Sequence, residues 1–333
     1  MKSFSGYFAI IAFLFFLSII FYSIDEIFIR RTLAETKSFE IKHGEGADSV
    51  IGRLGEDGII RNKFITQGYL VIVGIHRDIK PGIYFIGPPY SIKEIFDDFI
   101  KGGGLNVLLS EGLTVKEMAR IFQERKIVGN SAEFERLASA FDNSSGRYAF
   151  LPRSPKMNLE GYLFPDTYQF GNVSTKEVVE TILDNFESKV YSRFKNAAPR
   201  DFNETIIMAS MLEEEVQTPK DMKLVSGILH KRLETGIALQ VDATLVYIKC
   251  SLLNRPDCRS IANTDKEIKS SYNTYLYPGL PPGPISNPGL TAIEAAFDPE
   301  GSPYLYYLSA RDDGRTIFSR TLEEHNLNRA VYR

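Results

Sequence analysis

The hydrophobic pattern begins with one unbroken apolar run near the start of the chain. Residues 4–24, FSGYFAIIAFLFFLSIIFYSI, contain no charged side chain. As a helix that rises 1.5 Å per residue, the run reaches about 30 Å, the thickness of a bilayer's hydrocarbon core. A cleaved signal peptide has a shorter core and a small-x-small site, whereas aromatic and acidic residues end this run. We therefore predict a retained transmembrane helix at 4–24, followed by a polar stalk at 25–38.

Beyond the stalk, a strand-like pattern that changes to a helix-like one recurs at an offset of 68 residues. Phe39–Ile60 and Val107–Val128 each contain a short alternating segment, a glycine (Gly44 and Gly112) and apolar residues three and four apart. Gly82–Gly103 repeats the order with a Pro-Pro turn. The pattern predicts strand-turn-helix units.

Such units build a compact α+β module of the LysM kind, which we place at 39–130. Generic units without a binding role explain the pattern equally well, because periodicity encodes packing and not a site. From 131 to 333 we predict a second, mixed α+β domain. Its first part is helical except at Leu159–Phe170, where alternating aromatic and polar residues indicate either a strand and turn or the wall of a substrate groove. The segment 304–318 has the signature of a β-hairpin.

One predicted helix carries candidate chemistry. Glu204–Gln217, ETIIMASMLEEEVQ, is apolar nearly all round until three consecutive glutamates, and helices that are hydrophobic on every face are buried. Burial raises the pKa of a carboxyl group and keeps it protonated near neutrality, as a general acid requires. Glu213 lies over the small residues Ala209 and Ser210, which leaves room for a ligand. Three solvated glutamates at a helix end are the plainer interpretation.

A second helix follows at once. Thr218 is a good N-cap residue and Pro219 suits the first helical position, so a sharp turn holds Glu213 at a rigid corner. His230 falls near the far end of this second helix, where a cation meets the negative end of the helix dipole. We therefore interpret His230 as a capping residue and not as a catalytic base.

Composition and charge exclude several classes of protein. The 333 residues suffice for about two domains, and a net charge of -3 argues against a dedicated nucleic-acid binder. Four scattered histidines and two cysteines do not form a metal-site motif, and the sequence has neither a nucleotide-loop motif nor G-x-S-x-G. Ser192-Arg-Phe-Lys195 matches the S-x-x-K pattern, but a match of this kind is expected by chance, and no S-D-N or K-T-G follows it. We expect no metal and no cofactor. Cys250 and Cys258 lie in a polar loop and could form a disulfide in an oxidising compartment, although two free thiols are also compatible with the sequence.

The order of six motifs resembles that of a known family. ASMLEEE, LQVDAT, SYNTY, GLPPGPISNPG, PYLYYL and RTIFSRTLEEHN are similar to segments of the membrane-anchored endolytic murein transglycosylases, the YceG-like (MltG) family. The resemblance runs from about Phe39 to the C-terminus. It implies a membrane anchor, a LysM-like subdomain and a catalytic domain with Glu213 as the catalytic glutamate. It also implies substrate-binding residues in the groove, at Glu160, Tyr162, Gln240, Asp242, Tyr272, Asn273 and Tyr275.

The resemblance implies cleavage of the MurNAc-GlcNAc bond of nascent peptidoglycan strands, with formation of a 1,6-anhydro-MurNAc end and Glu213 as both general acid and base. Two alternatives stay open. One is a non-catalytic, peptidoglycan-binding scaffold for cell-wall synthases, and the other is a hydrolase that uses a second carboxylate such as Asp242. Charges on the two sides of the apolar run do not fix its orientation. Because a short N-terminal tail is easily left in the cytoplasm, we expect a single-pass protein of the inner membrane with its catalytic domain on the periplasmic side.

Overall fold

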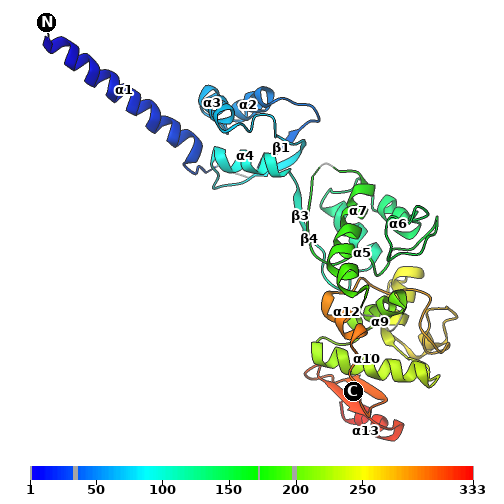
Figure 1. The fold of residues 1–333 in the computed structure, drawn as a ribbon. Coiled ribbons are helices and arrows are strands. Elements are labelled where there is room, and N and C mark those ends of the chain that lie inside the picture. Colours follow the sequence, from blue (N-terminus) through cyan, green and yellow to red (C-terminus); the bar gives the residue numbers. More distant parts are fainter. Residues whose placement is uncertain (1, 33–36, 172, 197–200, 333) are drawn as a thin grey trace. The chain divides into compact units, whose positions relative to one another are not determined.

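The computed structural model describes residues 2–32, 37–171, 173–196 and 201–332, and it has the mixed α+β fold class expected from the sequence (Figure 1). The chain divides into two compact units. Unit 1 comprises Met1–Val107 and Tyr168–Val173, and unit 2 comprises Leu108–Thr167 and Ser174–Arg333. The predicted module at 39–130 spans this division.

The apolar run forms the helix α1 (Lys2–Phe28). Its window Ile11–Phe28 is long and apolar enough to cross a membrane, and only 11% of that window is buried. The helix extends beyond the predicted span and includes the first residues of the predicted stalk. Residues 33–36 of that stalk lie outside the described part of the chain.

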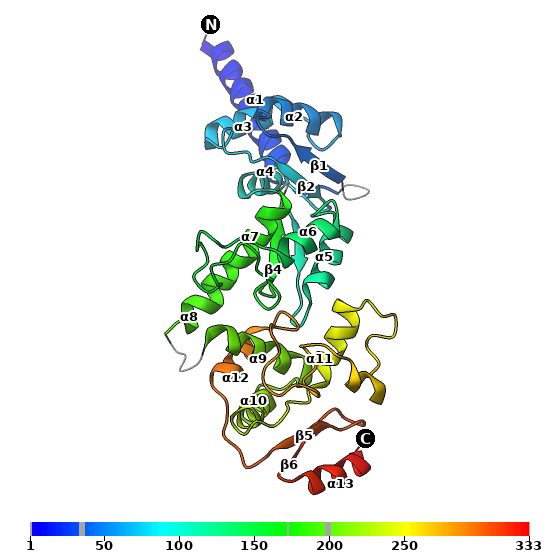
Figure 2. The ribbon, with the colours of Figure 1, turned by 90° about the vertical axis from the view of Figure 1, so that its right-hand side faces the viewer.

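Unit 1 packs three helices against a two-stranded antiparallel sheet (Figure 2). In chain order its elements after α1 are β1 (Lys37–Ile41), α2 (Ala47–Glu56), α3 (Lys63–Val73), β2 (Gly82–Ile86) and α4 (Ile92–Lys101). Val50, Leu54, Leu70 and Phe96 have no exposed surface, and they form the centre of the core. The apolar positions three and four apart thus face inward, as the amphipathic pattern predicts.

The predicted strand-turn-helix units are confirmed. The first is β1 and α2, the second is β3 (Leu105–Leu108) and α5 (Val115–Glu124), and β2 and α4 form the third. The equivalent turn glycines Gly44 and Gly112 have φ angles of 79° and 80°, a region that favours glycine because it has no Cβ atom. β3 pairs with β4 (Thr167–Phe170), which lies in the segment where the sequence indicated a strand and turn.

Unit 2 is organised around the apolar helix α9 (Phe202–Glu215), whose residues from Thr205 to Leu212 are all buried. α9 packs against three other helices of the unit. The helices of unit 2 are, after α5, α6 (Ser131–Ser139), α7 (Thr175–Phe186), α8 (Ser192–Phe194), α9, α10 (Pro219–Glu234), α11 (Asp242–Tyr247), α12 (Leu290–Phe297) and α13 (Leu322–Tyr332). Short π-helical turns follow α7 and α11, at Glu187–Tyr191 and Ile248–Leu252, and a 3-10 turn lies at Asn263–Glu267.

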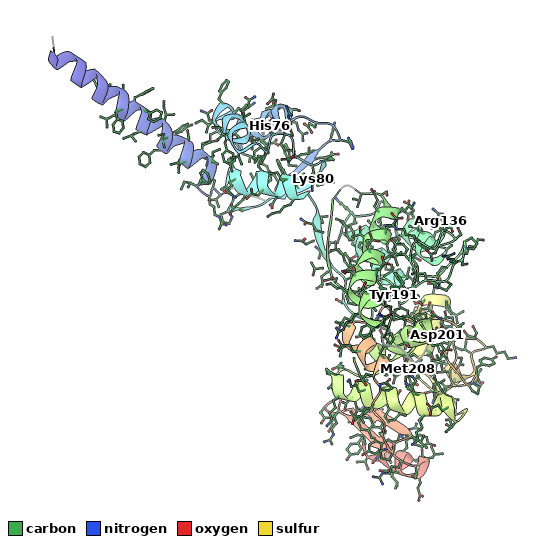
Figure 3. All side chains as sticks on the ribbon, viewed as in Figure 1. His76, Lys80, Arg136, Tyr191, Asp201 and Met208 are labelled. Carbon is green, nitrogen blue, oxygen red and sulfur yellow. A yellow bond between two sulfur atoms is a disulfide. The ribbon has the colours of Figure 1, made fainter. Side chains whose placement is uncertain are left out.

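Capping residues next to each helix explain where α9 and α10 begin. The Asp201 carboxylate caps α9 by accepting a hydrogen bond from the N–H of Glu204 over 3.1 Å (Figure 3). The Thr218 hydroxyl accepts a hydrogen bond of 3.1 Å from the N–H of Asp221, which confirms the predicted start of α10. The predicted hairpin is also present, as the antiparallel strands β5 (Tyr306–Ser309) and β6 (Thr316–Ser319).

Candidate active site

The three consecutive glutamates at the end of α9 meet three different surroundings. Glu213 is half-buried beside the start of α12, Glu214 lines a large pocket, and Glu215 borders a smaller one. Successive helical residues point about 100° apart, so a single run of three carboxylates supplies three separate positions. Glu214 is exposed at the pocket, whereas Glu213 and Glu215 are partly buried, so the plainer interpretation of three solvated side chains describes Glu214 only.

Glu213 is held by the backbone of α12. Its Oε2 accepts a hydrogen bond of 2.9 Å from the N–H of Gly289, the residue at the N-terminal end of that helix. Burial raises the pKa of Glu213 and the nearby Glu111 carboxylate raises it further, while the Gly289 hydrogen bond acts in the opposite direction. The net shift is upward, which favours the protonated form that a general acid needs.

Glu214 faces a pocket of about 570 Å³. Desolvation by the pocket wall, together with the charges of Glu213 and Glu117, raises the pKa of Glu214 to about 7. Gly112 leaves this carboxylate its space, because a Cβ atom at Gly112 would lie only 2.7 Å from Oε1 of Glu214. The turn glycine of the second repeat thus opens the pocket beside the glutamates.

Glu215 connects α9 to a second, smaller pocket of about 170 Å³. Its carboxylate accepts hydrogen bonds from the hydroxyl of Tyr307, at 3.2 Å, and from the N–H of Ala243, at 3.3 Å. The predicted residues Gln240, Asp242 and Tyr275 line the same pocket, and the Tyr275 hydroxyl donates a hydrogen bond to Asp242. Three of the seven predicted substrate-binding residues therefore lie together on an accessible surface beside α9.

Glu160 belongs to a buried hydrogen-bonded junction of loops. Its Oε1 accepts hydrogen bonds of 2.9 Å from the N–H of Val115 and from Nδ2 of Asn287. The Asn287 side chain also donates to the carbonyl of Leu113, and its Oδ1 accepts from the N–H of Gly161. Asn287 therefore joins the turn before α5, the Glu160 loop and the loop before α12. Glu160 is only 4% exposed, and burial raises its pKa to about 8.

Two other predicted residues support this framework. Tyr162 is fully buried and its hydroxyl donates to Oδ1 of Asn203 over 2.5 Å. Asn273 is fully buried, and its amide bonds the carbonyls of Lys266 and Ile268 at 3.0 and 2.8 Å. In this structure both side chains shape the loops and do not face either pocket.

Tyr272 lies in a chain of polar rings. Its ring centroid is 5.1 Å from that of the buried Tyr247, and the two hydroxyl groups interact. Tyr247 in turn interacts with Glu160 and lines the larger pocket. Tyr272 and Glu160 are therefore linked to the pocket through a residue that the sequence did not single out.

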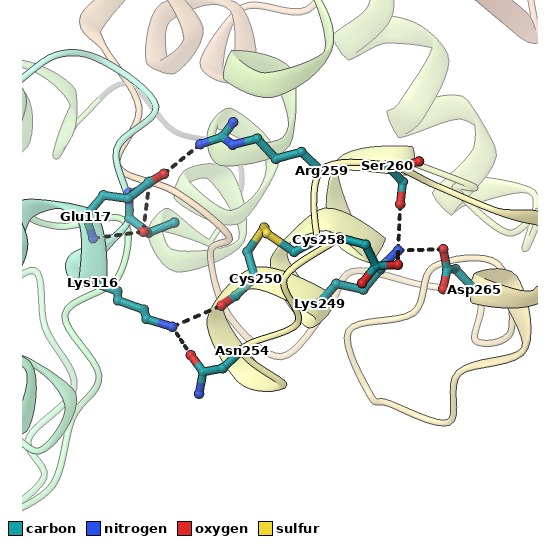
Figure 4. Close-up of a disulfide and its surroundings, with 11 residues drawn as sticks. Lys116, Glu117, Lys249, Cys250, Asn254, Cys258, Arg259, Ser260 and Asp265 are labelled. Atoms are coloured by element: carbon teal, nitrogen blue, oxygen red, sulfur yellow. Dashed lines mark hydrogen bonds and ion pairs between the residues drawn. A yellow bond between two sulfur atoms is a disulfide. The ribbon is translucent and has the colours of Figure 1, made fainter.

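A disulfide, shown with its surroundings in Figure 4, lines part of the larger pocket. Cys250 and Cys258 are bonded, so of the two states that the sequence left open the structure contains the disulfide. A hydrogen bond and an ion pair fasten this loop to α5: Lys116 donates to the carbonyl of Cys250 at 3.1 Å, and Arg259 pairs with Glu117 at 2.7 Å. The cross-link and these contacts together fix the part of the pocket wall that this loop forms.

Other site features had weaker signals in the sequence. Asn287 lies inside the GLPPGPISNPG motif, but nothing in its spacing indicates that its side chain joins three loops. Ser210 is buried on α9 and accepts a hydrogen bond of 3.0 Å from the N–H of Ile285, which fixes the same motif to the helix.

His230, interpreted as a capping residue, contacts the Ser226 carbonyl of its own helix through Nδ1, at 2.9 Å. Over the described ranges, no group of three or more His, Cys, Asp or Glu side chains is arranged to hold a metal ion.

Comparisons with known proteins agree on one family. The model of the YceG-like family matches residues 39–331. The chain is 26% identical over 314 residues to an endolytic murein transglycosylase of Bacillus subtilis, covering 89% of this chain and 85% of that protein. It is also 26% identical over 321 residues to an endolytic murein transglycosylase of Streptococcus pneumoniae, of which it spans 57%. The crystal structure of a YceG-like protein from Listeria monocytogenes, 27% identical, superimposes with a TM-score of 0.59 over 88% of this chain and 99% of that one.

Proposed function

The chain belongs to the YceG-like family, and on that premise we propose that it is a peptidoglycan lytic transglycosylase that cuts within glycan strands. Two relatives that carry the name endolytic murein transglycosylase support the general activity. The observation that carries the assignment of the catalytic residue is the position of Glu213, a half-buried carboxyl group with a raised pKa, fixed by the N–H of Gly289.

In the proposed reaction, protonated Glu213 donates its proton to the glycosidic oxygen between MurNAc and GlcNAc. The C6 hydroxyl of the muramoyl ring attacks C1 of the same ring, and the Glu213 carboxylate then accepts the hydroxyl proton. One bond to C1 breaks and one forms, so no water is consumed and the new end is a 1,6-anhydro sugar. The nucleophile is tethered to the reacting ring, an advantage that can reach effective molarities of roughly 10⁵ M or more.

We assign the substrate contacts to the accessible residues Gln240, Asp242 and Tyr275, whose polar groups line the pocket next to Glu215. Glu160, Tyr162, Tyr272 and Asn273 act indirectly in this proposal, because they hold the loops that surround the end of α9. We further propose that α1 anchors the protein in the membrane with the rest of the chain on the outer side, and that residues 39–130 form the LysM-like module.

A conventional hydrolase is the second candidate, and the raised pKa of Glu214 favours it, because two neighbouring carboxyl groups could serve as acid and base. The products separate the two reactions. A transglycosylase gives anhydro-muramoyl ends, which are lighter by one water than the reducing ends that a hydrolase gives. Under the third interpretation, a scaffold for cell-wall synthases, no cleavage occurs.

The experiment incubates polymeric glycan with the wild-type protein, Glu213→Gln and Glu204→Gln, and analyses the products by mass spectrometry. Glu204 is exposed in the first turn of the same helix and serves as a matched control. We expect anhydro ends from the wild-type protein and from Glu204→Gln, and a loss of about 10²-fold or more for Glu213→Gln, the typical size of a general acid-base contribution. Anhydro ends at the wild-type rate from Glu213→Gln would remove this residue from the mechanism.

A further inference from the structure

The outward face of α3 is apolar, the reverse of the usual pattern for a surface helix. Phe64 and Ile72 are each 86% exposed and Val71 is 57% exposed. At 100° per residue these three side chains fall within about 100° of one another, opposite the buried residues Thr66 and Leu70. A helix of a soluble domain normally presents charged and polar residues on that side.

α3 is attached directly to the end of α1. The Glu26 carboxylate of α1 has no exposed surface, and its Oε1 accepts hydrogen bonds from the N–H groups of Arg61 and Asn62 at 2.9 and 3.0 Å. Asn62 is the N-cap residue of α3. The rings of Phe28 and Tyr69 meet edge to face, with their centroids 5.9 Å apart. The two helices therefore belong to one packed body.

These contacts set the depth of α3 relative to the apolar run. The uncharged run ends at Ile24, and Glu26 follows two residues later, about 3 Å further along the helix axis. Amphipathic helices that lie on a membrane bury their apolar faces about 5–10 Å into the boundary between headgroups and acyl chains. If α1 spans the bilayer, α3 starts within that boundary layer.

The charges around α3 suit an anionic lipid surface. Residues 61–80 contain four basic side chains and one acidic side chain, Asp78. The basic residues flank the helix on both sides, at Arg61, Lys63, Arg77 and Lys80 (Lys80 is labelled in Figure 3). Arg61 is paired with Asp25 of α1 at 3.6 Å, which leaves Lys63, Arg77 and Lys80 as the cations for headgroups. Basic residues next to a membrane span are attracted to anionic headgroups.

We propose that the outward face of α3, formed by Phe64, Val71 and Ile72, docks into the surface of the lipid bilayer beside α1. The occupant is the lipid of the leaflet at which α1 ends, and the apolar side chains lie among its acyl chains while the flanking basic residues meet its headgroups. The inference rests on the proposed anchoring by α1 and is independent of the catalytic proposal. It gives unit 1 a second, shallow attachment next to its transmembrane helix.

The experiment uses the full chain in nanodiscs that contain phosphatidylglycerol. A single cysteine is introduced at Ile72 and labelled with an environment-sensitive fluorophore under non-reducing conditions, which leave the disulfide intact. Leu327 on α13, 65% exposed, is the matched control for an exposed apolar position far along the chain. Phe15 on α1 is the control for insertion of the span. Quenching is then measured with doxyl-labelled lipid and with aqueous iodide.

We expect the label at position 72 to be quenched by doxyl lipid and protected from iodide, and the label at position 327 to behave in the opposite way. Iodide quenching at position 72 equal to that at 327 would overturn the proposal. Protection from iodide without quenching by lipid would also overturn it, since protein and not lipid would then cover the face. The label at position 15 separates these results from a failure of anchoring, because a label inside the bilayer is quenched by doxyl lipid whatever α3 does.

Discussion

Asn287 donates a hydrogen bond of 2.9 Å from Nδ2 to Oε1 of Glu160, a residue 127 positions earlier in the chain. Asn287 is fully buried and Glu160 nearly so, and around this pair the loops that frame the end of α9 come together. The protonation of this buried carboxyl group therefore affects the stability of the fold, and its hydrogen bonds affect the shape of the site.

The first prediction concerns Glu160→Gln and the pH dependence of stability. The pKa of Glu160 is raised to about 8, from an ordinary value of 4.5, chiefly by burial. The folded state therefore keeps a proton that the unfolded state releases, so its contribution to stability is full below pH 4.5 and is lost as the pH rises to about 8. Replacement by glutamine removes this loss. We compare the unfolding free energy of Glu160→Gln with that of the wild-type protein at each pH. We expect this difference to be roughly 3 kcal/mol more favourable to the variant at pH 7 than at low pH.

Denaturant unfolding between pH 4.5 and 8 measures this effect, and Glu177→Gln is a control of opposite sign. The pKa of Glu177 is lowered by hydrogen bonds from Ser174 in the capping box of α7, so its contribution is present above pH 4.5 and is lost as the pH falls. Glu177→Gln should therefore weaken the protein at neutral pH. A stability of Glu160→Gln that declines with pH as steeply as that of the wild-type protein would contradict the buried, protonated state of Glu160.

Local signals in the sequence were sufficient for most of the fold. The change from alternating to helical periodicity after Gly44 and Gly112 predicted both turns, because these glycines adopt a backbone conformation that other residues adopt only with strain. Thr218 and Pro219 fixed the start of α10 through capping, and the apolar faces of α9 predicted its burial. Each of these features depends on residues close together in the chain.

The arrangement of the site was less accessible from the sequence, since it depends on contacts between distant segments. Alternation around Leu159–Phe170 could not show that Tyr162 points into an aromatic core, because Tyr162 lies in a turn before β4, where the two-residue period of a strand does not apply. Asn273 has an amide side chain of the kind that often binds sugars, yet that amide donates hydrogen bonds to two carbonyl groups of its own loop. The pairing of Cys250 with Cys258 depends on the distance between the two Cα atoms, 4.9 Å, which no spacing rule supplies.

The second prediction uses the two equivalent turn glycines of the internal repeat. Gly112→Ala and Gly44→Ala introduce the same backbone strain, about 1–2 kcal/mol, since both positions have positive φ angles. Only at Gly112 does the new Cβ atom meet the site, 2.7 Å from Oε1 of Glu214 and 3.7 Å from Cγ of Glu213, whereas no atom lies within 4 Å at Gly44. We expect Gly112→Ala to lose on the order of 10-fold or more in rate, because small displacements of catalytic groups are costly.

Rates are compared per folded molecule, with the folded fraction measured by circular dichroism for each variant. Gly44→Ala should keep the wild-type rate despite an equal loss of stability. Equal rates for the two variants would mean that the turn of the second repeat does not control the position of the glutamates.

The third prediction concerns the disulfide. Its residues are eight apart in sequence, and cross-linking a loop of that size stabilises a protein by about 2.5 kcal/mol in the chain-entropy model. We expect the double variant Cys250→Ser/Cys258→Ser to lose about that much unfolding free energy in denaturant titrations. Dithiothreitol should cause a similar loss in the wild-type protein and no change in the double variant. A loss in the double variant on adding reductant would assign the effect to something other than this bond.

The last prediction tests how the surroundings of Glu213 set the pH dependence of the reaction. The proposed general acid must be protonated at the start of each turnover, so activity falls as the pH rises through the pKa of Glu213. The negative charge of Glu111 raises that pKa, because it makes a second negative charge nearby less favourable. Glu111→Gln removes the charge and should lower the pKa of Glu213. The alkaline limb of the profile of kcat/KM against pH is therefore expected to move to lower pH.

The same substitution should leave the rate at acidic pH close to that of the wild-type protein, since Glu213 is protonated there in both. This split between acidic and neutral pH distinguishes a change of pKa from damage to the site, which would lower the rate at every pH. Glu204→Gln removes a carboxylate from the opposite end of α9 and should leave the limb in place. A limb that stays fixed in Glu111→Gln, or moves to higher pH, would mean that the group controlling the reaction is not the carboxyl beside Gly289.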